Sequence, residues 1–237
     1  MRSLLLFCLV VGLAQASAAD ITLRVGASRA DVTPEPDVLN WVTGKPYGEI
    51  LEQISVHALV LDDGTTRAAL LRYDIVDISE SLRDEVRRVV GAALGIPGGN
   101  ILLNASHNHS APWAPVYGGA YRGKERDSWW AIRHMPAQNE FPPFKRWMER
   151  LLAASVEAAK GAAESAVPVS MAIGRIAAPE LLYNRRPRSP AWGIEGKLPA
   201  AVGYSHKDWN PEVAQLGASF GPMDRTLSLV SFRGRDD

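Results

Sequence analysis

The alternation of apolar and polar residues predicts several short β-strands separated by turns. Residues 56–61 and 67–73 are two such strands, and Asp62, Asp63 and Gly64 between them form the turn of a β-hairpin. The strand expected at residues 100–105 is apolar enough to lie in the centre of a sheet. Further strands are expected at residues 21–25, 169–176 and 226–232.

Apolar residues recur at helical spacing in two longer segments. The first helix is expected to begin at Asp77, which can cap it together with Glu80, and to end at Gly95. The second begins near Pro142 and carries its apolar stripe over residues 144–159. The order strand, strand, helix, strand predicts an α/β fold, with a mixed β-sheet flanked by helices.

Three segments without periodicity are expected to be loops, at residues 34–53, 111–141 and 178–222. Aromatic side chains in such loops either line sites for apolar or sugar ligands or hold the loops in place. Five of the seven tryptophans fall in polar stretches rich in Gly and Pro: Trp113, Trp129, Trp130, Trp192 and Trp209.

The N-terminus has the features of a secretory signal peptide. Arg2 is followed by an apolar segment at residues 4–13, and residues 16–18 read Ala-Ser-Ala, a signal-peptidase pattern. We expect a signal peptide at residues 1–18 and a secreted or periplasmic mature chain at residues 19–237; an uncleaved membrane anchor is the alternative. The only cysteine is Cys8, so the mature chain would contain no disulfide.

The composition of the chain limits the kinds of molecule that it is expected to bind. The chain has 26 basic and 26 acidic residues and no basic run, which argues against binding of nucleic acid. The mature length allows one sizeable domain. Because residues 233–237 read as the opening of a hairpin turn without a return strand, we expect the N-terminal portion of a longer polypeptide.

Candidate chemistry is concentrated at residues 101–112, where an apolar run carries His107 and His109 to a turn at Pro112. On an extended backbone, residues i and i+2 point to the same side, so one metal ion or one substrate could meet both imidazoles. Histidine is a common zinc ligand and transfers protons near neutral pH. His57 is expected to be packed within its strand.

Several segments, in the same order along the chain, resemble motifs of the neutral (neutral/alkaline, non-lysosomal) ceramidases. Residues 26–34 are similar to their opening G-x-x-x-x-D-I-T segment, and residues 56–61 to their early strand. Residues 104–112 resemble the motif H-T-H-S-G-P. Residues 183–187 stand where that family has N-R-S-P, and residues 223–229 resemble V-D-x-x-M-T-L.

The resemblance implies roles for three residues in hydrolysis of the amide of N-acyl sphingoid bases. His107 matches a zinc ligand, His109 a polar or proton-handling group near the substrate amide, and Arg185 an arginine at the substrate or the developing oxyanion. The family's remaining ligands, a histidine, a glutamate and a tyrosine, would lie outside this sequence. The resemblance therefore implies an incomplete catalytic domain at residues 19–237, and we expect the chain alone to bind zinc weakly and to have little activity.

Other interpretations remain open from the residues themselves. His109 could be a second zinc ligand, Arg185 could form an ordinary salt bridge, and Asp74 could orient a ligand histidine or only shape a turn. Ala111 and Trp113 replace glycines of the family motif, which would reshape the pocket.

The leading hypothesis is a zinc-dependent hydrolase of a linear amide in an N-acyl lipid. A substrate of this kind also implies peripheral contact with a membrane. The alternative is a secreted, non-catalytic module that binds a lipid or a glycan through residues 111–141 and 178–210.

Overall fold

The computed structural model describes residues 22–41, 43–117, 141–178, 187–188, 219–220, 224 and 226–234. The chain divides into two compact units, one of residues 1–170 with 234–237 and the other of residues 171–233. The expected signal peptide lies outside the described residues. None of the helices within the described ranges is both long and apolar enough to cross a bilayer.

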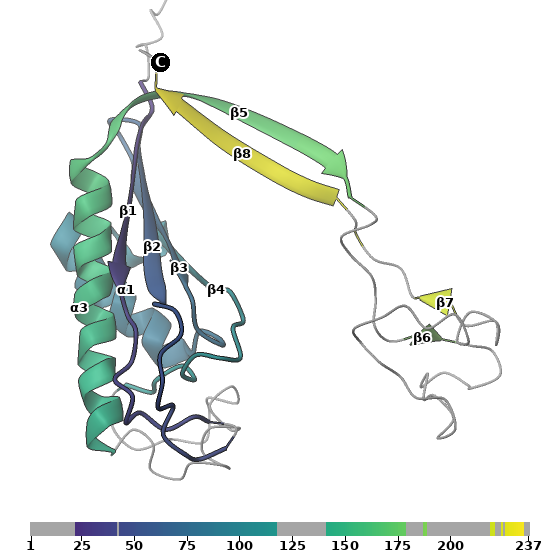
Figure 1. Cartoon of the computed structure of the whole chain (residues 1–237). Coiled ribbons are helices and arrows are strands. Elements are labelled where there is room, and N and C mark those ends of the chain that lie inside the picture. The colour runs from purple at the N-terminus through teal and green to yellow at the C-terminus, as the bar shows by residue number, and fades with distance from the viewer. Residues whose placement is uncertain are drawn as a thin grey trace, which may run out of the picture. The chain divides into compact units, whose positions relative to one another are not determined.

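The first unit contains a sheet in which antiparallel and parallel pairs are mixed (Figure 1). Its strands β1 and β2 pair antiparallel, as do β2 and β3, whereas β3 and β4 pair parallel. These strands are β1 (Arg24–Asp31), β2 (Ser55–Asp62), β3 (Arg67–Tyr73) and β4 (Ile101–Ala105). The prediction of a mixed α/β sheet is confirmed, although β1 begins and ends later than the strand expected at residues 21–25.

Helix α1 (Glu80–Leu94) connects β3 to β4, as a parallel pair requires. Its N-cap is Ser79, whose side chain accepts a hydrogen bond from the Leu82 amide, so the prediction that Asp77 caps it was wrong. The carboxylate of Asp77 instead accepts from the Ala114 amide at 3.3 Å. Gly95 ends the helix in the left-handed conformation, as expected. A short 3₁₀ turn, η1 (Gly98–Asn100), precedes β4.

Helix α3 (Pro142–Glu164) packs closely against β1, as Figure 1 shows. A Cβ atom on Gly26 would lie 2.0 Å from the carbonyl oxygen of Ala162, which leaves no room for any side chain. The indole of Trp147 donates to the Val32 carbonyl at 2.8 Å and fixes the other end of the same contact. Gly26, the first residue of the ceramidase-like segment, is therefore required by helix–sheet packing.

The two helices cover one face of this sheet, and the core lies between the helices and the sheet. Residues that alternate along the strands onto this face are buried: Val56, Ala58, Val60, Ala69, Leu71 and Tyr73. The opposite face carries Leu70 and Leu102, which are 42% and 56% exposed. Strands β2 and β3 thus have one buried and one accessible face, which explains their alternating sequences.

The second unit contains most of β5 (Val167–Ala177) and β8 (Thr226–Gly234), which pair with each other. It also contains a short antiparallel pair, β6 (Pro187–Arg188) with β7 (Ser219–Phe220). The first residues of β5 pair with β1, which gives the order β4-β3-β2-β1-β5-β8. Among the described strands β4 is therefore at an edge, and the prediction that it is central was wrong.

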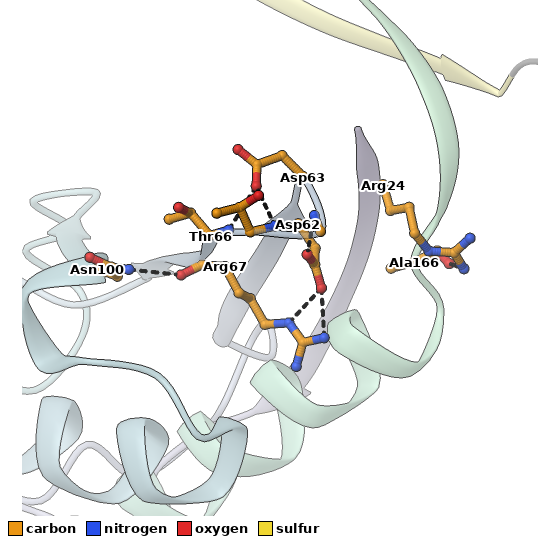
Figure 2. Close-up of polar contacts among 9 residues, drawn as sticks. Arg24, Asp62, Asp63, Thr66, Arg67, Asn100 and Ala166 are labelled. Carbon is orange, nitrogen blue, oxygen red and sulfur yellow. Dashed lines mark hydrogen bonds and ion pairs between the residues drawn. The ribbon is translucent and has the colours of Figure 1, made fainter. Parts of the chain in front are cut away.

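Figure 2 shows the turn that joins β2 to β3, where polar groups are paired locally. Asp62 accepts from the Gly64 amide at 2.9 Å and forms an ion pair with Arg67 at 2.6 Å. The carboxylate of Asp63 accepts from the amides of Thr65 and Thr66. The predicted hairpin is confirmed, with Gly64 at a φ of 83°.

Candidate functional site

The histidine motif forms a turn directly after β4. The Ser106 amide donates to the Tyr73 carbonyl at 2.9 Å, and the Asn108 amide donates to the Ile75 carbonyl at 3.2 Å. Between them His107 has a φ of 60°, in the left-handed region. Such a conformation is uncommon for a residue with a side chain, although histidine is enriched among the exceptions. The prediction that the backbone is extended at this point was therefore wrong.

The structure nevertheless brings the two imidazoles together. The Nε2 atoms of His107 and His109 are 3.2 Å apart, and the ring centroids are 4.8 Å apart at an interplanar angle of 72°. Both residues are exposed to solvent. The left-handed turn thus brings the two imidazoles side by side, as the extended strand was expected to do.

Hydrogen bonding fixes the tautomer of neutral His107. Its Nδ1 lies 2.8 Å from the Val76 carbonyl oxygen, which can only accept, so Nδ1 carries the proton. The Nε2 of His107 then presents a lone pair, and the facing Nε2 of His109 is the donor. A backbone carbonyl that orients an imidazole in this way is a common feature of metal-binding histidines.

The histidine pair fits part of a zinc site. Zinc binds imidazole nitrogens at about 2.0–2.1 Å in a tetrahedron, which separates two ligand nitrogens by about 3.3–3.4 Å. The observed separation of 3.2 Å is close to this value. Within the described ranges no group of three or more His, Cys, Asp or Glu residues could hold a metal ion. The pair would need further donors to complete a site.

Trp41 packs beside this pair and was not singled out from the sequence. Its ring meets the His109 ring edge-on at 5.5 Å and the Trp113 ring at 4.7 Å. Its indole nitrogen donates to the Ala111 carbonyl at 3.2 Å. The signal that drew attention to the other tryptophans, an aromatic residue in a segment rich in Pro and Gly, could have identified Trp41 as well.

An open cleft of about 890 Å³ adjoins the turn. Asn108, His109 and Ser110 line it, together with residues of the loop that precedes β2. That loop contributes both polar residues, including Tyr47, and apolar ones, including Leu51. The Tyr47 phenol is protonated at neutral pH and can donate a hydrogen bond, and burial raises its pKa further above its ordinary value. A cleft of mixed polarity is suited to an amphiphilic ligand.

Asp74 also lines the cleft, and of its two expected roles the contacts favour the local one, because its carboxylate accepts from the Ser55 amide at 3.3 Å. Its carboxylate lies 3.0 Å from Arg72 and 3.7 Å from the Nε2 of His57. The His57 side chain is 42% exposed, so the prediction that it is packed was wrong. The carbonyl of Val76, rather than Asp74, orients His107. No side-chain pattern in the sequence marks this carbonyl.

Arg185 lies outside the described residues, as does most of each predicted ligand-binding loop. The described beginning of the first loop is buried, with Trp113 7% exposed. Ser79 donates to the Pro115 carbonyl at 2.7 Å, and Ser81 accepts from the Tyr117 amide at 2.9 Å. Residues 113–117 are thus attached to the beginning of α1.

No family model matches the sequence, and no curated protein matches it. Two ceramidase structures are among the solved structures that are similar to the chain. One, described as a ceramidase complexed with C2, has a TM-score of 0.58 at 18% identity. The other, neutral ceramidase from Pseudomonas aeruginosa, has a TM-score of 0.54 at 17% identity. Each match covers 92% of this chain and 30% of the other.

The chain therefore spans less than a third of the length of these structures. At this level of identity the match concerns the fold, and it agrees with the resemblance that the motifs indicated. The α/β unit that carries His107 and His109 has the fold of one portion of the neutral ceramidases.

Proposed function

We propose that the chain supplies the histidine-bearing portion of an exported, zinc-dependent hydrolase that cleaves a linear amide in an N-acyl lipid. The main supporting observation is the pair of Nε2 atoms 3.2 Å apart, with His107 oriented through its other ring nitrogen. The ceramidase-like fold supports the same class of activity.

The two histidines take different roles in this proposal. His107 binds zinc through Nε2, because its Nδ1 proton is engaged by the Val76 carbonyl. Zinc in such a site lowers the pKa of a bound water to about 7 and polarises a carbonyl group. His109 transfers the proton between the attacking water and the leaving amine, a function typically worth about 10²–10⁴-fold in rate. Arg185, by the resemblance, stabilises the oxyanion.

The cleft supports an amphiphilic substrate. Apolar side chains such as Ile50 and Leu51 and polar groups such as Tyr47 and Asn108 line the same cleft, and His109 lines it as well. An N-acyl lipid presents hydrocarbon next to a polar amide, which matches this distribution. Hydrolysis of such a substrate would take place at or near a membrane surface, with the protein in peripheral contact.

The test is hydrolysis of a short-chain fluorescent N-acyl sphingosine by the product of the whole gene, with and without a zinc chelator. The proposal predicts loss of turnover with chelator and in His107→Ala, and recovery of the chelated wild type when zinc is restored. His57→Ala is the matched control, because His57 lies in the same sheet without contacting the pair, and it should retain activity.

Turnover that is indifferent to chelator and to His107→Ala would contradict the proposal. Binding of the lipid without hydrolysis, unaffected by either change, would favour the non-catalytic binding module instead.

A further inference from the structure

We propose that Trp41 is a positioning residue that holds His109 against His107; this inference rests on the proposed function of the pair. The two histidines are supported differently. His107 has a hydrogen bond from its own ring to the Val76 carbonyl. The ring contacts of His109 in the described chain are with His107 and Trp41.

Trp41 supports His109 in two ways. The edge-on ring contact at 5.5 Å limits the orientations open to the imidazole, and aromatic pairs favour this T-shaped arrangement. The indole N–H also donates to the carbonyl of Ala111, two residues after His109, at 3.2 Å. One side chain therefore restrains both the ring and the backbone turn that carries it.

Trp41 is itself well fixed. It is only 9% exposed, and the ring of Trp113 packs on it at 4.7 Å. The loop around it is tight, with the Asn40 amide donating to the Lys45 carbonyl at 2.8 Å and the Gly44 amide donating to the Asn40 carbonyl at 2.7 Å. A restrained loop and a neighbouring indole give Trp41 the rigidity that a positioning role requires.

Loss of Trp41 would release an exposed imidazole on a turn with unfavourable backbone geometry. His109 could then rotate into solvent, and the separation of 3.2 Å between the nitrogens would no longer be maintained. Substitutions of groups that orient the residues of such a site typically cost about 10–100-fold in metal affinity or activity, and for a proton-transfer group we expect the loss in activity.

The experiment compares Trp41→Leu, which removes both contacts, with Trp41→Phe, which keeps an aromatic ring but removes the hydrogen bond. Trp147→Phe is the matched control, because it removes another buried indole-to-carbonyl bond, to Val32. Two quantities are measured on the 237-residue chain: the ¹⁵N chemical shifts of the imidazoles without metal, and the affinity for Zn²⁺ alone.

We expect the His109 Nε2 signal of Trp41→Leu to shift towards that of an imidazole free in solution. Its zinc affinity should change little, because His107 is the assigned ligand and keeps its bond to the Val76 carbonyl. Trp41→Phe should show a smaller change in the same direction, which decides the matter if the leucine variant does not fold. Trp147→Phe should lose stability while its His109 signal and zinc affinity stay as in the wild type.

Unchanged His109 signals in a folded Trp41 variant would overturn the inference. Absence of zinc binding by the wild-type chain would not bear on Trp41, since the pair needs further donors to complete a zinc site. Failure of the whole gene product to hydrolyse an N-acyl lipid would count against the proposed function instead. The metal-free ¹⁵N shifts would still decide whether Trp41 positions His109.

Discussion

Two turns at opposite ends of the sheet, the hairpin end between β2 and β3 and the histidine end directly after β4, change the direction of the chain in different ways. At the hairpin end, residues 62–67, Gly64 adopts a positive φ of 83° and polar side chains pair within five positions in the sequence (Figure 2). At the histidine end, residues 105–112, a positive φ of 60° falls on His107. Its ring partner, Val76, is 31 positions away, and Trp41 reaches Ala111 across 70 positions.

The difference distinguishes a turn built for folding from one built around particular side chains. A glycine at positive φ costs little, whereas a residue with a Cβ atom in the left-handed region costs about 1–2 kcal/mol. Non-glycine residues in strained conformations persist where surrounding structure holds them, and they cluster at functional sites. His107 meets this description, and Gly64 does not.

The largest predicted effect concerns activity at the histidine end. His109→Ala should reduce hydrolysis of an N-acyl lipid by about 10²–10⁴-fold, the range expected for loss of a proton-transfer group. Asp62→Ala at the hairpin end should leave the rate per folded molecule unchanged. Steady-state rates, normalised to the folded fraction measured by circular dichroism, would test this contrast. Equal losses of rate in the two variants would contradict a functional difference between the histidine end and the hairpin end.

The second prediction concerns backbone strain at the histidine end. His107→Gly should be more stable than His107→Ala by about 1 kcal/mol. Both variants lack the imidazole, but the positive φ at this position is unfavourable only for alanine, which has a Cβ atom. Urea unfolding of the two variants measures the difference. Equal stability of the alanine and glycine variants would show that the turn is not strained.

The third prediction is that glycine is also preferred over alanine at the hairpin end, where the natural residue, Gly64, is already a glycine. Gly64→Ala should destabilise the chain by about 1 kcal/mol, since the turn requires a φ of 83°. A steric clash would not contribute, because among the described residues no neighbouring atom would lie within 4 Å of a Cβ at this position. A thermal midpoint equal to that of the wild type would contradict this.

The smallest effect is on the pH dependence of stability. The Gly64 amide and the Arg67 guanidinium lower the pKa of Asp62 below its ordinary value of 3.8. The unfolded chain therefore binds this proton more readily, so the contribution to stability is present above about pH 4 and is lost as pH falls through the lower folded-state pKa. Asp62→Asn should reduce the difference between urea midpoints at neutral and acidic pH; an unchanged difference would count against the effect.

Sequence reasoning succeeded where interactions are local. The hairpin turn, the end of α1 at Gly95 and the beginning of α3 at Pro142 follow from signals within a few residues. It also located His107 and His109 as a pair. It missed the left-handed turn, the Val76 carbonyl and Trp41, because their partners are separated by many residues and meet only after the sheet has formed.

The same reason explains the error at α1. Asp77 and Ser79 are both suitable caps by residue type. The choice of Ser79 coincides with the docking of residues 113–117, where Ser79 also donates to the Pro115 carbonyl and Asp77 accepts from the Ala114 amide. A preference decided by tertiary contacts is not visible in the local sequence.

The most direct test of the account is a titration of the chain with Zn²⁺, followed by the ¹⁵N chemical shifts of its imidazoles. The account predicts that the signals of His107 and His109 change together as one zinc ion binds per chain, while His57 keeps its metal-free shift. Zinc binding that leaves the His107 and His109 signals unchanged, or that shifts His57 to the same degree, would contradict it.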